Sequence, residues 1–274
     1  MIEKYYNGVI EQVAGGIGNV EHNSILVRYS NDFSIWDLES VNHYKDQTDI
    51  FFTCHEFSYN KIAEAYEPYL GLIRQMFHKY CSGTLEEFME ECDVYKLQRP
   101  VFESYFEKGF CERTEQILID EVEYEQERMH SSIVTMLQKL SEICPIVIVL
   151  NRFQLASKST MQLTNRLLQT KNKNIGIVLG VNDVQSIPEF AHEEWDAICE
   201  SMDDRNMVYH IGNAGRNMEP DVMDYYSDYE SDDGYRKLNN LVYFLDFDQA
   251  DHHLSKIERR LSLIHISEPT RQEA

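Results

Sequence analysis

The chain has 274 residues, 43% of them hydrophobic, and a formal charge of -22 at neutral pH. This length suits one α/β domain, alone or with a small appendage. The charge excludes direct contact with nucleic acid or an anionic membrane, because both require a basic surface. The sequence contains neither an apolar run of membrane length nor the apolar core of a signal peptide, so we expect a cytoplasmic protein. Six cysteines without a Cys-x-x-Cys pair indicate reduced thiols and no metal site.

The first part of the chain alternates between helix and strand patterns. Residues 2–14 carry apolar side chains at helical spacing, and the glycines that follow end this helix rather than form a phosphate loop. Strands are expected at 24–29 and 48–53, with a helix at 34–44 between them. This order predicts that the N-terminal residues already belong to a layered α/β domain.

A long helical insertion is predicted at 58–144. An apolar stripe runs through 59–81, and Pro68 inside it predicts a kink. Thr84 and Glu87 form a capping-box pattern, which predicts the start of another helix. Two more helices are expected, one from Pro100 and the longest at 115–143.

The most apolar segment of the sequence follows this insertion. Every residue from Ile146 to Leu150 is aliphatic, which indicates a strand buried on both faces, as in a parallel sheet. Further elements are expected as a helix at 160–171, a strand at 175–181, a helix at 188–202 and a strand at 207–211. The sequence therefore predicts an α/β fold with a five-stranded, mainly parallel sheet and a large helical insertion between strands 2 and 3. Ligands of such sheets bind at the carboxyl edge, here around Asn151.

The C-terminal quarter has three parts of different composition. Residues 213–234 are acidic and almost without aliphatics, which predicts a disordered loop. Apolar spacing predicts two short helices within 235–261, and we expect them to begin a following helical region. Residues 262–274 resemble the translated read-through of a sequencing-library adapter. This resemblance implies a non-native tail on a protein that continues naturally beyond Leu261.

Four segments resemble parts of a known ATPase domain. Residues 24–38 (SILVRYSNDFSIWDL) have the strand, loop and helix form of a Walker A segment, and 51–73 (FFTCHEFSYNKIAEAYEPYLGLI) resemble the next strand and its "Pro-Tyr" helix. Residues 145–156 (PIVIVLNRFQLA) correspond to the Walker B strand and 175–183 (IGIVLGVND) to the sensor strand. Residues 1–212 thus resemble the nucleotide-binding domain of the STAND group of AAA-like P-loop NTPases.

This resemblance implies a place in a larger protein. The segment is similar to the amino-terminal region of large bacterial signalling proteins, where such a domain precedes helical repeats and a diguanylate cyclase domain. The implied partners are those downstream repeats or other protein domains.

Several residues depart from the ATPase pattern. A working phosphate loop needs glycines and a lysine, but residues 29–36 contain neither, and Asp32 would repel phosphates. At the Walker B position the metal-binding carboxylate is replaced by Asn151 and the neighbouring acid by Arg152. The resemblance leaves only a vestigial nucleotide pocket, formed by Ser30, Asn31, Ser34, Asn151 and Asn182. We therefore expect a non-catalytic regulatory or scaffolding module with no cofactor.

Three alternatives remain open from the sequence. The first is an ATPase or nucleotide switch that binds ATP and magnesium in an unconventional way. The second is an adaptor that recognises a basic partner through the acidic, tyrosine-rich loop. The third is a nucleophile and base formed by Cys54 and His55, although adjacent residues of a strand point to opposite faces. A core cysteine beside a surface histidine is the expected reading of that pair.

Overall fold

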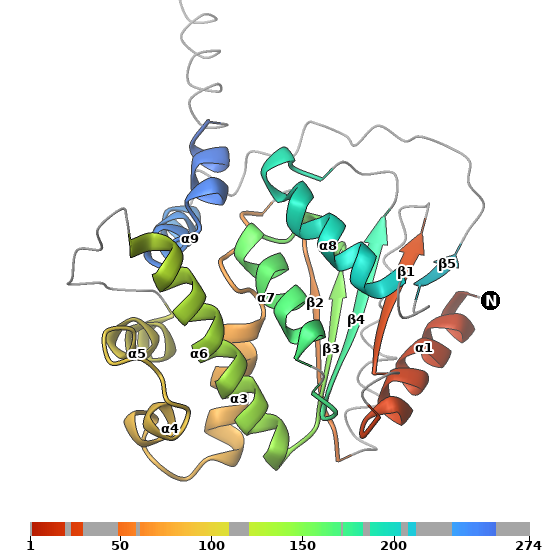
Figure 1. Ribbon diagram of the computed structural model, residues 1–274, viewed down its shortest axis with the longest axis horizontal. Helices are drawn as coiled ribbons and strands as arrows, with labels where there is room; N and C mark the ends of the chain where they lie inside the picture. Colours follow the sequence, from red (N-terminus) through yellow and green to blue (C-terminus); the bar gives the residue numbers. More distant parts are fainter. Residues whose placement is uncertain are drawn as a thin grey trace, which may run out of the picture.

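The computed structural model describes residues 2–19, 23–29, 49–58, 61–109, 121–170, 172–182, 187–203, 208–211 and 232–255. In these ranges the chain is an α/β structure with a parallel sheet and helices against both faces (Figure 1), so the predicted α/β class with a parallel sheet is confirmed. The expected helix at 34–44 and the tail at 262–274 lie outside the described residues. No helix in the described ranges is both long and apolar enough to cross a membrane.

The sheet has the order β2-β3-β4-β1-β5, and every pairing in it is parallel. Its members are β1 (Ser24–Tyr29), β2 (Phe51–Glu56), β3 (Ile146–Asn151), β4 (Ile175–Asn182) and β5 (Val208–Ile211). β5 is the shortest and pairs with β1 at one margin. Every residue of β3 and β4 is buried, as the aliphatic run in β3 predicts.

The two faces of the sheet carry separate apolar clusters. Helix α1 (Ile2–Gly16) covers one face of the sheet. There Val9, Ile10 and Val13 pack against the alternate strand side chains that point to this face. Gly176 permits this close approach, because a Cβ at that position would lie 2.6 Å from Val13 Cγ1. The opposite face is covered by α6 (Val122–Ile143), α7 (Lys158–Gln169) and α8 (His192–Asp203), with the short helix η3 (Glu189–Ala191) leading into α8.

The insertion between β2 and β3 is helical, as predicted. It contains α3 (Tyr69–Tyr80), α4 (Leu85–Glu91), α5 (Arg99–Lys108) and α6. The capping box of Thr84 and Glu87 is present at the start of α4, and Pro100 lies in the first turn of α5. The expected inner stripe is buried, since Ile62, Tyr69 and Ile73 are each at most 2% exposed. Residues 115–120 of the expected longest helix lie outside the described residues.

The predicted kinked helix around Pro68 is wrong. Helix α3 begins only at Tyr69, and Pro68 is its N-cap residue. Proline lacks the amide hydrogen that a helix interior needs and disfavours helical geometry in the residue before it, so the chain up to Pro68 is irregular. Tyr66 adopts a positive φ of 58° there. Ile62 and Tyr66 are nevertheless buried, which explains why the apolar stripe began before the helix.

The C-terminal helices pack on the insertion. Helix α9 (Asp232–Tyr243) is followed by a second helix at 247–255. Phe244 is fully buried, and its ring centroid lies 5.6 Å from that of Tyr66 and 5.7 Å from that of Tyr105. Leu238, Leu241 and Leu245 are likewise buried within this chain. Three apolar side chains of these helices remain exposed, namely Val242 at 45%, Phe247 at 43% and Leu254 at 48%. Of the expected disordered loop, 232–234 form the start of α9 and 213–231 lie outside the described residues.

Candidate functional site

Two of the predicted site residues meet at the carboxyl edge of the sheet. Asn151 is the last residue of β3 and Asn182 the last of β4, and these strands pair in parallel. Both side chains are buried, with exposures of 0% and 4%. The other three predicted residues, Ser30, Asn31 and Ser34, lie outside the described residues. The structure therefore places two of the five predicted residues at one edge of the sheet, and the vestigial nucleotide pocket stays a prediction.

Neutral amides dominate this edge. The side-chain oxygen of Asn151 accepts a hydrogen bond from the backbone N–H of Arg152 at 2.9 Å. Gln154, which is fully buried in the short helix η2 (Phe153–Leu155), accepts one from the backbone N–H of Asn182 at 3.3 Å. Gln154 thus joins the ends of β3 and β4. Sequence reasoning missed this role, although a glutamine between two apolar residues was a usable signal.

Arg152 has an unusual backbone conformation at the same edge. Its φ of 52° and ψ of 41° are left-handed, which is uncommon for a residue other than glycine. Its side chain forms an ion pair with Glu56 at the end of β2, with 3.4 Å between Nε and Oε1. Strained backbone of this kind gathers at functional sites in proteins. Here it turns the chain from β3 into η2 and places a guanidinium beside the amides.

A carboxylate of the C-terminal region caps the next helix. The N-cap of α7 is Ser157, which accepts a hydrogen bond from the Thr160 N–H. Asp246 accepts a second bond from the Ser159 N–H at 2.9 Å. Its side chain is buried, and this burial raises the pKa of Asp246 above its usual value. The positive end of α7, which could otherwise attract an anion, is therefore occupied by the chain itself.

Comparisons with known proteins do not assign the chain. No protein-family model, curated protein or solved structure matches it. Within the described ranges no three His, Cys, Asp or Glu side chains are grouped closely enough to hold a metal ion. The topology of the sheet and the chemistry of its carboxyl edge are therefore the features that bear on function.

The end of β2 forms a small cavity of about 120 Å³ beside this edge. His55 lines it with its side chain 22% exposed, so the histidine expected at the surface is half-buried. Burial, assisted by the nearby charge of Lys61, lowers the pKa of His55 to about 4. The His55 ring packs on Phe57, whereas Cys54 packs with the α1-side cluster. The two side chains lie on opposite faces of the sheet, which speaks against a nucleophile and base.

Proposed function

We propose that this chain contains a degenerate P-loop NTPase domain of the AAA-like type, which acts as a non-catalytic regulatory or scaffolding module in a larger bacterial cytosolic signalling protein. The strand order supports this proposal. The segments that resemble the Walker A, Walker B and sensor strands supply β1, β3 and β4, which are neighbours in one parallel sheet. In this chain β4 lies between β1 and β3 and ends at Asn182.

The observation that carries the non-catalytic part is the chemistry of the β3 end. A magnesium ion bound with a nucleotide takes oxygen ligands and usually at least one carboxylate. Asn151 instead offers a buried neutral amide whose oxygen already accepts the Arg152 N–H. The adjacent guanidinium of Arg152 pairs with Glu56, and its positive charge disfavours a cation nearby.

The loop after β1 supports the same conclusion from sequence alone. Backbone N–H groups can approach phosphates only where glycines leave room, and a lysine must reach the β and γ oxygens. Residues 29–36 read YSNDFSIW and supply neither residue type. The phosphate site and the metal site have thus each lost their chemistry, and one loss does not depend on the other.

Calorimetry with ATP and magnesium tests the proposal directly. We expect no dissociation constant tighter than about 1 mM, which corresponds to a binding free energy of about -4 kcal/mol. Phosphate release should not exceed that of buffer. A micromolar dissociation constant would refute the degenerate-site argument and favour the nucleotide switch.

A variant that restores the acid at the end of β3 sharpens this test. Asn151→Asp places a carboxylate where the side chain is fully buried, so thermal stability should fall and magnesium should not restore it. Asn239→Asp makes the same change at an exposed position of α9 and should leave stability nearly unchanged. Recovery of stability by magnesium in Asn151→Asp alone would show that the edge still provides a metal site.

A further inference from the structure

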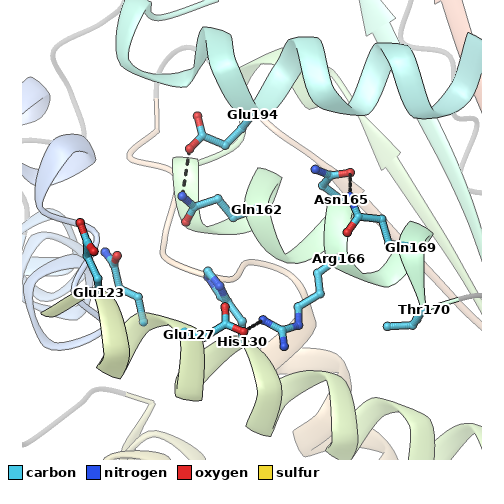
Figure 2. A pocket seen from close by; sticks show the side chains of 10 residues that line it. Glu123, Glu127, His130, Gln162, Asn165, Arg166, Gln169, Thr170 and Glu194 are labelled. Atoms are coloured by element: carbon cyan, nitrogen blue, oxygen red, sulfur yellow. Dashed lines mark hydrogen bonds and ion pairs between the residues drawn. The ribbon is translucent and has the colours of Figure 1, made fainter. Parts of the chain in front are cut away.

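A large hollow of the described structure lies away from the sheet edge, between α6, α7 and the start of α8. It is a groove with a volume of about 640 Å³, within the range of small-molecule sites. Its lining is polar and comprises Glu123, Gln126, Glu127, His130, Gln162, Asn165, Arg166, Gln169, Thr170 and Glu194. Figure 2 shows that these side chains come from facing helices and reach into one space.

The groove has an excess of negative charge. Three glutamates line it, and the cationic side chain in its lining, Arg166, is already bound to Glu127 and to the Ser131 hydroxyl. Glu194 Oε1 lies 3.8 Å from Lys158 Nζ, but this ammonium is shared with Asp248 at 2.6 Å. The carboxylates are dispersed, because Glu123 and Glu127 belong to α6 while Glu194 lies on α8 across the groove (Figure 2). Since the described residues hold no compact group of metal ligands, this arrangement suits several separated cationic groups better than one metal ion.

Two side chains of the groove have unmet hydrogen-bonding capacity. His130 is 7% exposed, and its Nε2 has no hydrogen-bond partner among the described residues; the same holds for Oε2 of Glu194. A buried polar atom without a partner is costly, so a donor that reaches it is favoured. A neutral imidazole can accept at Nε2 when its proton is on Nδ1. Both residues line the groove, so these two atoms are the ones that a donor group of a bound ligand would satisfy.

We propose that this groove binds a linear polyamine, with ammonium groups at the Glu194 end and at the Glu123 and Glu127 end. The methylene segments between the ammonium groups would lie along the amide side chains of α7, and a terminal ammonium would donate to Glu194 or His130. Non-specific attraction of a cation to the negative charge of the chain would instead depend equally on acidic residues inside and outside the groove.

Calorimetry with spermidine in 0.15 M salt tests this proposal, because exposed long-range attraction is largely screened there. We expect saturable one-to-one binding that Glu194→Gln weakens about tenfold. Glu123→Gln should weaken it about two- to fivefold, since Glu123 is exposed. Glu142→Gln removes the same charge from an exposed position of α6 outside the groove and should leave the affinity unchanged. Equal effects of all three variants would overturn the proposal, as would absence of binding.

Two further arms identify the ligand and the role of His130. Magnesium at equal ionic strength should not displace spermidine, and a capped lysine-rich peptide should bind more weakly; the opposite result in either arm overturns the polyamine assignment. His130→Phe keeps a ring against Tyr66 but removes the nitrogen, so spermidine affinity should fall while the unfolding temperature does not. A fall in unfolding temperature with unchanged affinity would make His130 a packing residue only.

Discussion

Phe244 provides a sharp test of how the C-terminal helices belong to the fold. Its side chain is fully buried, and aromatic rings of Tyr66, Phe102 and Tyr105 surround it. The next residue is held in place, because Gln126 donates to the Leu245 carbonyl at 2.6 Å, so a cavity here cannot collapse freely. Phe244→Ala should therefore cost about 3 to 5 kcal/mol of unfolding free energy, as for other buried aromatic truncations.

Urea unfolding followed by circular dichroism measures this cost as a lower midpoint at an unchanged slope. Val242→Ala, two residues earlier in the last turn of α9 and 45% exposed, is the control and should cost less than about 0.5 kcal/mol. A cost for Phe244→Ala below about 1 kcal/mol, or one equal to that of the control, would show that α9 is not part of the cooperative core.

The remaining predictions concern a buried histidine and a close helix contact. Burial, assisted by Arg166, lowers the pKa of His130 to about 4. Only the unfolded chain then binds a proton at His130 between about pH 6.5 and 4, so this side chain removes stability as the pH falls. The free energy of unfolding, measured in urea at pH 7.5 and at pH 5, should fall about 2 kcal/mol less between these pH values in His130→Phe than in the parent chain. An equal fall in both proteins would contradict the reasoning. Gly176→Ala should cost about 1 to 3 kcal/mol in thermal unfolding, because its Cβ would clash with Val13. Gly71→Ala, in a helix with open space around it, should instead be neutral or stabilising, and equal effects of the two changes would refute the packing argument.

The sheet could be predicted because its signals are local. The aliphatic run from Ile146 to Leu150 can be satisfied only by burial on both faces, and it forms the fully buried strand β3. Strand ends at Asn151 and Asn182 follow from the same pattern, and parallel pairing brings them to one edge. The direction of the amide hydrogen bonds is not local, because it depends on how η2 folds back and brings Gln154 to Asn182.

The parts that escaped prediction depend on partners far apart in the chain. Nothing near Asp246 indicates that it caps a helix 87 residues earlier. The acidic and amide side chains that line the groove looked like ordinary solvated helix faces until α6, α7 and α8 were placed side by side. The prediction of a helix through Pro68 failed for a different reason. The apolar residues around Ile62 and Tyr66 have helical spacing, but the backbone there is not helical.

The docking of the last helices also determines when the chain can finish folding. Glu64 accepts from Asn240, 176 residues later, and Gln126 donates to the Leu245 carbonyl, 119 residues later. At a synthesis rate of about 5 to 20 residues per second, the segment that covers the aromatic residues around Tyr66 is synthesised roughly 10 to 35 s after Tyr66 itself. Contacts of such long range also slow folding itself. The nascent insertion therefore exposes an apolar surface throughout this interval, and such a surface is prone to aggregation.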